Sequence, residues 1–275
     1  MNIVLTGQKG LIGSFLKKEL IFKGNQIVDE WDLKDGKDIS FMGNYLVDSK
    51  PDMLIHMAAH CKINQSITNP ERTFQSNVLG TYNVFEFARK NGIKKIVYFS
   101  SSRVLSKEKN PYTASKLYGE ELCKAYKDSY GIDSIIVRPS TVYGPIFDET
   151  GRLMHIFIRN ALQNKPLEIY GDLETKTLDF TYVSDFVNGV MLAMNGPWNT
   201  AYNISGKQET RLIDLANFIV TETNSQSKII QKREELAQPQ KVALDLLEIE
   251  KLGYIPRVDI WEGTRRNIQF LVGLN

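Results

Sequence analysis

A tyrosine and a lysine four residues apart, Tyr112 and Lys116, are by type and spacing the residues of this chain best suited to moving a proton. They follow Pro111, which fits the first turn of a helix because its missing N–H costs nothing there. On a helix, residues i and i+4 project from one face. A nearby ammonium lowers the pKa of a phenol from about 10, and a shift of about three units takes about 4 kcal/mol. The pair could therefore serve as a general acid and base near neutral pH, although the same spacing also occurs in helices without a catalytic role.

A glycine-rich segment near the N-terminus is typical of a loop that binds phosphate. The strand-like run at residues 2–5 leads into a loop at residues 6–13, and a helical pattern follows. Glycines at the first strand–helix junction let the backbone approach a pyrophosphate at the helix N-terminus. The sequence therefore predicts a dinucleotide site, the alternative being a tight turn only. The loop residues assigned to the cofactor are Gly7, Lys9, Gly10, Leu11, Ile12 and Gly13.

The residues after the second predicted strand bear on the identity of the dinucleotide. Asp32 lies at the end of the strand at residues 26–32, where an acidic side chain can hold the adenosine ribose hydroxyls, which favours NAD. Lys9 could instead meet a 2′-phosphate, which leaves NADP open. Asp38 and Ile39 stand where they could touch adenine, or they form a surface turn.

Two further strands end in residues that could face a ligand. The strand beginning at Asp52 runs into Met57-Ala58-Ala59, whose small side chains would let a cofactor approach closely. The strand at residues 95–99 ends in Ser100-Ser101-Ser102, at the edge where open α/β sheets place their ligands. The alternative for the serines is a polar strand end. His56 and His60 straddle a strand end with no acidic or cysteine ligand nearby, so no metal site is predicted.

Alternating strands and helices up to about residue 145 predict an α/β fold with a Rossmann-type, doubly wound parallel sheet. One of the helices is expected at about residues 70–90. Beyond residue 145 the pattern loosens, which predicts a smaller mixed C-terminal lobe that binds substrate over the cleft. We assign residues 1–145 with 180–206 to the dinucleotide-binding domain, and residues 146–179 with 207–275 to the smaller lobe.

The composition narrows the class of protein. Because 34 basic and 32 acidic residues nearly balance, the net charge of +2 gives no electrostatic argument for nucleic acid or membrane binding. Two cysteines, Cys61 and Cys123, fit a reducing compartment rather than a disulfide framework. No N-terminal targeting pattern and no apolar run of membrane-spanning length is found. We therefore expect a cytoplasmic protein that binds neither nucleic acid nor membrane.

Together these motifs resemble the extended short-chain dehydrogenase/reductase family, in particular its sugar-nucleotide epimerases, dehydratases and reductases. The resemblance covers nearly the whole chain, and its motifs are specific jointly rather than singly. The matching segments are Thr6–Gly13, His56–Ala59, Asn77–Thr81, Ser100–Val104, Tyr112–Lys116, Arg138–Pro145 and Asp179–Asp185.

The resemblance implies a role for each site residue. Tyr112 is the general acid/base, and Lys116 holds the nicotinamide ribose and lowers the pKa of Tyr112. A serine hydrogen-bonds the substrate oxygen, and counting back from Val104 favours Ser101 over Ser102. The further cofactor contacts are Met57, Ala58, Ala59, Asn77, Ser100 and Pro139, and the substrate contacts are Ser102, Thr141 and Lys176.

The chain departs from the family pattern mainly in its substrate half. Ser102-Arg103 stands where 4,6-dehydratases carry an Asp-Glu pair, which disfavours a dehydratase. The stretch from Ser101 to Tyr112 is short, so the pocket is expected to be more open. Side chains that hold the substrate diphosphate in many members are replaced by Thr141, Leu178 and a residue near Gln238-Pro239, for which Lys176, Arg152 or Arg233 could substitute.

These observations favour an NAD-dependent epimerase of a nucleoside-diphosphate sugar, similar to UDP-glucose 4-epimerase. The alternative is an NAD(P)-dependent reductase or dehydrogenase of a dTDP-, GDP- or CDP-4-keto-6-deoxyhexose, which Lys9 motivates. A further alternative is a non-catalytic, cofactor-binding regulatory protein, which the lost arginines and the short loop motivate. The family also implies a homodimer, formed through the helices that contain residues 82–88 and 118–126.

Overall fold

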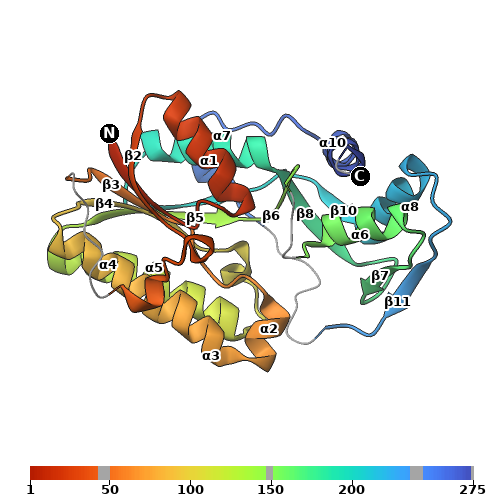
Figure 1. Ribbon diagram of the computed structural model, residues 1–275, viewed down its shortest axis with the longest axis horizontal. Helices are drawn as coiled ribbons and strands as arrows, with labels where there is room; N and C mark the ends of the chain where they lie inside the picture. The colour runs from red at the N-terminus through yellow and green to blue at the C-terminus, as the bar shows by residue number, and fades with distance from the viewer. Residues whose placement is uncertain (43–49, 147–150, 236–243, 274–275) are drawn as a thin grey trace.

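The structure is a computed structural model that describes residues 1–42, 50–146, 151–235 and 244–273. Its largest element is a six-stranded sheet in the order β2-β1-β3-β4-β5-β9, in which every pair of neighbours is parallel (Figure 1). The strand order reverses between β1 and β3, and ligands of doubly wound sheets bind at such a point. The predicted doubly wound parallel sheet is confirmed. The strands are β1 (Asn2–Thr6), β2 (Gln26–Trp31), β3 (Met53–His56), β4 (Lys95–Phe99), β5 (Asp133–Pro139) and β9 (Thr200–Ile204).

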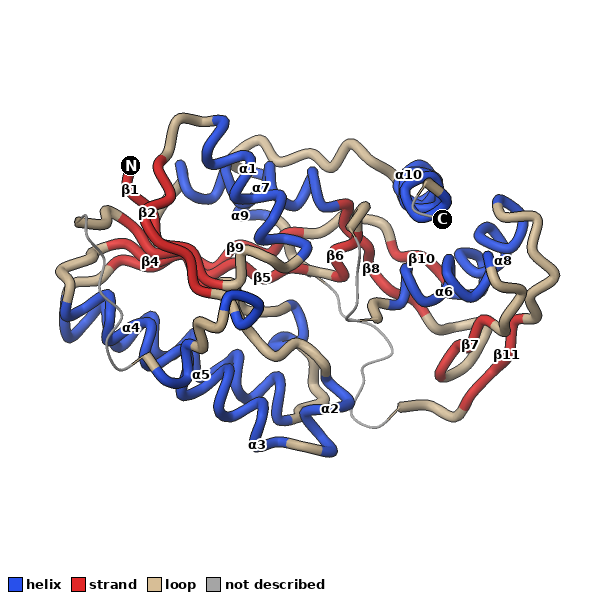
Figure 2. Tube along the Cα trace, in the orientation of Figure 1, coloured by secondary structure: helices blue, strands red, loops and turns tan. Residues whose placement is uncertain are grey.

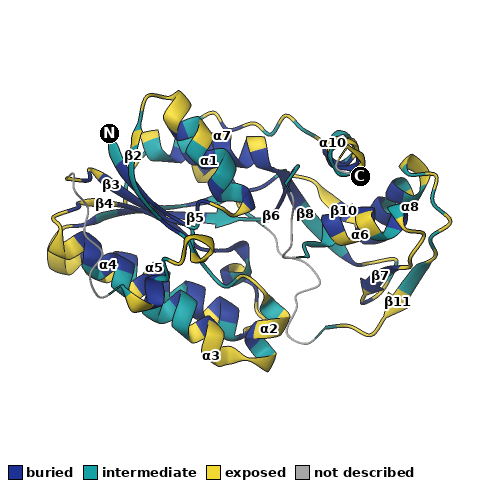
Figure 3. Cartoon of the chain, viewed as in Figure 1, coloured by how far each residue is buried: buried dark blue, intermediate teal, exposed yellow. Residues whose placement is uncertain are grey.

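Helices cover both faces of this sheet (Figures 1 and 2). On one face lie α1 (Leu11–Phe22) and α7 (Val183–Asn195), and on the other α4 (Gly80–Lys90) and α5 (Pro111–Tyr130). Because successive strand residues point to opposite faces, β4 sends Val97 and Phe99 into one core and Ile96 and Tyr98 into the other. The central strands are buried throughout (Figure 3), which is why they read as continuous apolar runs.

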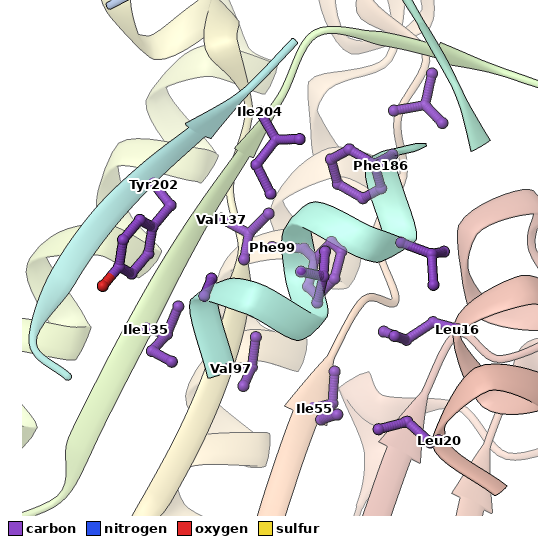
Figure 4. Close-up of a cluster of buried hydrophobic side chains, with 14 of the residues drawn as sticks. Leu16, Leu20, Ile55, Val97, Phe99, Ile135, Val137, Phe186, Tyr202 and Ile204 are labelled. Carbon is purple, nitrogen blue, oxygen red and sulfur yellow. The ribbon is translucent and has the colours of Figure 1, made fainter. Parts of the chain in front are cut away.

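The core under α7 packs side chains from six strands and three helices closely together. Figure 4 shows Leu16 and Leu20 of α1 and Phe186 of α7 lying over residues of β3, β4, β5 and β9. Phe99, the last residue of β4, contacts Phe186 edge-on, with ring centroids 6.1 Å apart. The end of β4 that leads into the serines is therefore fixed by packing.

The helix predicted at residues 70–90 is interrupted. It consists of α3 (Pro70–Thr73), a π-helical segment η3 (Phe74–Leu79) and α4. The extra residue per turn of a π-helix often marks a functional site. Gly80 follows this segment and packs closely against Ile39. A Cβ atom at Gly80 would lie only 2.8 Å from the Ile39 side chain. A short helix before it, α2 (Ile63–Thr68), was not predicted.

The C-terminal part forms a smaller mixed lobe with its own buried cluster, as predicted. Its three-stranded sheet has the order β10-β8-β6, with β6 parallel and β10 antiparallel to β8, and its second sheet pairs β7 with β11 in parallel. The elements are β6 (Thr141–Tyr143), α6 (Leu153–Leu162), β7 (Leu167–Tyr170), β8 (Thr177–Tyr182), β10 (Glu209–Arg211), α8 (Leu212–Glu222), β11 (Ile229–Lys232) and α10 (Ile260–Val272).

One segment of the C-terminal region returns to the first sheet. Leu246, Ile249 and Tyr254, in and around α9 (Leu247–Glu250), are buried in the same cluster as β9 and α7. The Tyr254 hydroxyl donates to the carbonyl of Ser205 at 3.0 Å. The division of the chain into two domains stays a proposal, and this packing favours placing residues 246–254 with the dinucleotide-binding domain.

A buried histidine joins the ends of β1 and β3 to α4. The Thr6 hydroxyl accepts hydrogen bonds from the backbone N–H groups of Met57 and Ala58, so its own proton goes to Nδ1 of His56, 2.7 Å away. The opposite nitrogen, Nε2, then carries a proton and donates to the Thr81 hydroxyl at 3.0 Å. Both ring nitrogens are thus satisfied by a neutral imidazole, and burial lowers the pKa of His56 to about 3.

This pKa predicts an acid-sensitive stability. The folded-state pKa of His56 is depressed from 6.5 to about 3, so its stabilisation is complete above pH 6.5 and is lost as the pH falls towards 3. Between pH 6.5 and pH 5 the loss is about 2 kcal/mol. We expect His56→Gln to be less stable than the wild type at pH 7.5, and this difference in unfolding free energy to narrow by about 2 kcal/mol at pH 5. Urea unfolding at both pH values measures it, and an unchanged difference would contradict a neutral, buried His56.

Candidate active site

The glycine loop between β1 and α1 brings backbone segments into close contact. Gly7 has a φ of +75°, and a Cβ atom there would lie 2.7 Å from the backbone nitrogen of Ala58. A Cβ at Gly13 would lie 2.3 Å from the Gly7 carbonyl oxygen, whereas at Gly10 the nearest atom would be 3.4 Å away. The fold itself therefore requires the first and third glycines. Gly10 leaves bare backbone at the start of α1, where dinucleotide folds bind the pyrophosphate.

Acidic residues after β2 hold this loop in place. The Asp32 carboxylate accepts from the backbone N–H of Lys9 and from that of Lys34, each at 3.0 Å. The side chains of Gln8 and Lys9 both donate to Asp35. Asp32 thus lies beside the loop, and its predicted contact with the adenosine ribose stays a prediction. The Lys9 ammonium, on which the NADP alternative rested, is paired with a carboxylate.

The start of α5 is fixed by its own sequence. The Asn110 side chain accepts from the backbone N–H of Thr113 at 2.9 Å, and the Thr113 hydroxyl is within 2.9 Å of the Asn110 backbone nitrogen, a reciprocal capping box. At the other end, Gly131 closes the helix with a φ of +63°. Tyr112, one residue inside the helix, is 7% exposed. Its position is therefore determined by a well-defined helix start.

The Ser101 side chain lies close enough to the Tyr112 hydroxyl to lower the pKa of the phenol. Ser101 lies just after β4 and caps a short 3₁₀ turn, η4 (Ser102–Leu105), by accepting from the backbone N–H of Arg103 at 3.2 Å. The Cys61 side chain also acts on Tyr112, and it raises the pKa of the phenol. Of the three serines, Ser101 is the one that affects this pKa, and its contact with the substrate stays a prediction.

The predicted effect of Lys116 on Tyr112 is wrong for this structure. The pKa of Tyr112 is raised, chiefly because the phenol is buried, and Cys61 raises it further. Hydrogen bonding by Ser101 and the charge of Arg103 lower it, whereas Lys116 is not among the causes. The Lys116 ammonium donates instead to the Phe99 carbonyl at 2.7 Å, and burial lowers its pKa. The cation that acts on Tyr112 is therefore Arg103.

Behind these residues, a buried ion pair ties α5 to the sheet. The Ser100 hydroxyl donates to Glu120 at 2.5 Å, and Arg138 of β5 donates to both oxygens of Glu120 at 2.8 and 2.5 Å. A bidentate guanidinium–carboxylate pair fixes both position and orientation. The Ser100 hydroxyl gives its proton to Glu120 in this network. The predicted contact of Ser100 with the cofactor stays a prediction.

Three other predicted cofactor residues also make contacts within the protein. Asn77, in the π-helical segment, hydrogen-bonds with the backbone of His60 and with the Ser115 hydroxyl. Asp38 accepts from the N–H and hydroxyl groups of Ser40, and Ile39 is buried. These residues position the segment after β3, helix α5 and the turn at residues 38–41 that packs against α4. Their contact with a cofactor stays a prediction.

A pocket with a cavity volume of about 70 Å³ lies between the η4 turn and the three-stranded sheet of the smaller lobe. This volume is below the few hundred Å³ typical of ligand sites, so the pocket would enclose only part of a ligand. The predicted substrate residues Ser102 and Thr141 both line it, and Leu178 lines it where an arginine was expected. Lys176, next to the pocket residue Thr177, is 8% exposed. The pocket residues are Ser101, Ser102, Arg103, Ser140, Thr141, Thr177, Leu178, Asp179, Glu209 and Leu244.

Comparison with known proteins decides the family. The model of the NAD dependent epimerase/dehydratase family matches residues 3–205. The chain belongs to the NAD-dependent epimerase/dehydratase family. The resemblance drawn from the sequence motifs is thereby confirmed, and the protein is an enzyme of this NAD-dependent type.

Individual relatives match over the full length. A putative UDP-glucose 4-epimerase of Methanocaldococcus jannaschii is 31% identical over 305 residues, covering 99% of this chain and 99% of that protein. The UDP-glucose 4-epimerase of Thermus thermophilus, solved with NAD, superposes with a TM-score of 0.86 at 22% identity over 99% of each chain. A Bacillus cereus UDP-glucuronic acid 4-epimerase, solved with a UDP-sugar and NAD, gives 0.88 at 23% identity over 100% of each chain.

The cofactor of this epimerase/dehydratase family member is NAD, and the residues present fit it. The space beside Gly10 admits a phosphate close to the backbone, and Asp32 is held beside the same loop. The segment after β3 passes close to the backbone of Gly7 at the small residue Ala58. Met57, Ala59 and Pro139 lie at strand ends of this same sheet, but no contact of theirs tests the assigned role.

Sequence reasoning missed three residues of this site. Cys61 follows the Ala58-Ala59 segment and reaches Tyr112. Glu120 lies one helical turn after Lys116, a spacing that could have pointed to it. Arg103 was noted only as a departure from the dehydratase pattern, and it lines the pocket. Gln238-Pro239, also noted as a departure, lies outside the described residues.

Two features typical of other protein classes are absent from the part of the chain that the structure describes. In that part, no three histidine, cysteine, aspartate or glutamate side chains gather so that they could hold a metal ion. Nor does any helix there combine the length and apolar character needed to cross a membrane.

The spacing around the glycines predicts different effects for two similar substitutions. Gly10→Ala adds a Cβ at ordinary contact distance, 3.4 Å from the Gly7 carbonyl oxygen, so we expect an unchanged melting temperature and NAD binding weakened by about tenfold, which corresponds to about 1.4 kcal/mol. Gly13→Ala forces a Cβ against backbone and is expected to lower the melting temperature. Circular dichroism and calorimetric titration with NAD measure both effects. Wild-type NAD affinity in Gly10→Ala would rule out pyrophosphate binding beside this residue.

Proposed function

We propose that this protein is an NAD-dependent epimerase acting at C4 of a nucleoside-diphosphate sugar, similar to UDP-glucose 4-epimerase. The observation that carries the proposal is the buried Tyr112, which lies beside Ser101 at the edge of the pocket. The absence of a dehydratase acid pair at Ser102-Arg103 supports epimerisation over dehydration. Relatives named as UDP-glucose 4-epimerases, over the full length of the chain, support the same conclusion.

The chain's residues divide the work between binding and proton transfer. NAD, when bound, supplies the carbon that takes up and returns a hydride. Tyr112 takes the proton of the sugar 4-hydroxyl and later returns it, while Ser101 hydrogen-bonds the same oxygen. Only the phenolate can take this proton, and burial disfavours the phenolate by raising the pKa of Tyr112. The hydrogen bond from Ser101 and the charge of Arg103 both favour the phenolate, and they assist its action as a base.

The binding residues follow from the same geometry. The loop from Gly7 to Gly13 would hold the pyrophosphate, and Asp32 the adenosine ribose. Lys116 would hold the nicotinamide ribose from its position next to the Phe99 carbonyl. Ser102, Thr141 and Lys176 would contact the nucleotide sugar. A pocket at the carboxyl end of the sheet supports this arrangement.

Replacing Tyr112 by Phe tests the proposal. We expect Tyr112→Phe to lower the rate of interconversion of UDP-glucose and UDP-galactose by about 10²- to 10⁴-fold, because it removes the proton-transfer group. The NAD content after purification should be unchanged. Chromatography of the sugar nucleotides measures the rate, and Tyr118→Phe on the same helix is the matched control.

Two outcomes would redirect the assignment. Stoichiometric consumption of reduced cofactor during turnover would indicate the keto-sugar reductase instead of the epimerase. Unchanged function of Tyr112→Phe in cells would indicate the non-catalytic, cofactor-binding role.

We also propose a homodimer formed through α4 and α5. Tyr82 of α4 is 44% exposed and lies near Tyr118 and Tyr126 of α5. Tyr130, at the end of α5, is also 44% exposed. Exposed aromatic side chains gathered on adjacent helices are typical of subunit interfaces.

A cytoplasmic location is proposed on the two free cysteines.

The dimer can be tested by adding charge to this face. We expect the wild type to have the mass of a dimer in light scattering after size-exclusion chromatography, and Tyr82→Glu to have that of a monomer, because a buried unpaired carboxylate disfavours association. Phe22→Glu, on the exposed side of α1, is the matched control. A monomeric wild type would refute the proposal.

A further inference from the structure

Arg103 stands on a rigid turn at the wall of the pocket. Its backbone N–H donates to Ser101, and its carbonyl accepts from the N–H of Ser106 at 3.1 Å. The Lys109 ammonium donates to the carbonyls of Val104 and Ser106 at 3.0 and 2.6 Å, which closes the loop on itself. The Arg103 side chain is partly buried and lines the pocket with Ser101 and Ser102. Its guanidinium is thus presented to the pocket from a fixed backbone.

The charge of this guanidinium is not matched by a direct partner. Within the described residues it makes no hydrogen bond and no ion pair, whereas Arg138 nearby is paired with both oxygens of Glu120. A guanidinium has five N–H donors and loses hydration when it is buried. Burial lowers the pKa of Arg103, and only the more distant charges of Tyr112 and Glu235 oppose this. The side chain therefore has donors available for an anion.

Charges of both signs surround Arg103, and the acidic ones stand on other elements. The charge of Arg103 lowers the pKa of Lys176, after the larger effect of burial. The carboxylates that act on Lys176 are those of Glu234 and Glu235. On the opposite wall, Asp179 already accepts from Ser205 and from the Gly206 N–H, and Glu209 lies next to it on β10. These acids belong to the sheet of the smaller lobe, whereas Arg103 belongs to the turn that carries Ser101.

The position of Arg103 indicates which part of a substrate it would meet. Ser101 contacts both the Tyr112 hydroxyl and the backbone of Arg103, and the charge of Arg103 acts on Tyr112. In the proposed reaction, Tyr112 and Ser101 hold the oxygen on C4 of the sugar. The carbons next to C4 are C3 and C5, and C5 bears C6. The diphosphate is attached at C1, across the ring. Arg103 is therefore closer to the group on C5 than to the diphosphate on C1.

We propose that Arg103 binds a carboxylate at C6, so that the preferred substrate is a nucleoside-diphosphate hexuronic acid rather than a neutral hexose. The planar guanidinium can take both carboxylate oxygens in a bidentate pair, which a primary hydroxyl at C6 cannot form. Ser102, whose side chain lines the same wall, can add a hydrogen bond. This inference rests on the proposed function for the orientation of the sugar, and it adds the class of sugar.

Binding measurements test the inference separately from catalysis. The Tyr112→Phe protein, purified with its NAD, is titrated calorimetrically with UDP-glucuronic acid, UDP-glucose and UDP. We expect the uronic acid to bind at least about tenfold more tightly than UDP-glucose. Arg103→Met should remove this preference while changing the affinities for UDP-glucose and UDP by less than about threefold. Arg103→Lys should keep part of the preference for the uronic acid, since lysine keeps the positive charge but cannot form a bidentate pair with the carboxylate.

Other results would overturn the inference. If Arg103→Met weakens the binding of all three ligands equally, Arg103 binds the diphosphate. If Arg103→Met lowers the melting temperature without changing the preference for the uronic acid, the role of Arg103 is structural. If Arg103→Met in an otherwise wild-type enzyme lowers the rates with UDP-glucuronic acid and UDP-glucose equally and shifts the pH profile of the rate, Arg103 acts only on Tyr112. If the uronic acid preference is found but no C4 epimer forms with the wild-type enzyme, the proposed reaction fails and the carboxylate site stands.

Discussion

The hydroxyl of Thr6 holds together the part of the molecule on which the cofactor site depends. One oxygen atom receives the backbone N–H groups of Met57 and Ala58 and gives its proton to His56. The ends of β1 and β3 are thereby fixed side by side at the point where the strand order reverses. Gly7 is left with no room for a side chain, and the loop that follows must run directly into α1.

The reacting groups are held by a second set of contacts on the other side of β4. Asn77 connects the segment after β3 to α5, and the pair of Glu120 and Arg138 connects α5 to β5. Tyr112 and Lys116 therefore stand on a helix that is fixed from both neighbouring strands. A hydroxyl and an ammonium in a buried site need such support, because small displacements change their electrostatic interactions strongly.

The local signals in the sequence were sufficient for the parallel sheet and for the order of strand, glycine loop and helix at the N-terminus, whereas the choice of Ser101 stays a prediction. Each depends on residues close together in the chain, such as the alternation of strand and helix or the register from Val104. The π-helical segment around Asn77 was not predictable, because its apolar spacing reads as an ordinary helix. The three-stranded sheet pairs segments far apart in the chain, so its pairing has no local signature.

The site shows the same division between local and distant information. The spacing of Tyr112 and Lys116 was correct, but the expected effect of the ammonium on the phenol was wrong, because burial and the Phe99 carbonyl decide where that charge acts. Cys61, Arg103 and Glu120 reach the site through tertiary contacts, and single residue types give little signal for these. Spacing therefore identifies which groups can react, whereas packing determines their protonation.

The way the chain passes between the sheet and the smaller lobe limits how the enzyme can move. It crosses from β5 to β6, from β8 to α7, from β9 to β10, and again after Tyr254 towards α10. Asn64 of α2 also bonds with Glu235 of the lobe, from the opposite side. A hinge between rigid bodies needs a few residues that absorb the whole rotation, and several parallel connections oppose it. We therefore expect sugar nucleotides to enter and leave by rearrangement of surface segments around a nearly rigid frame.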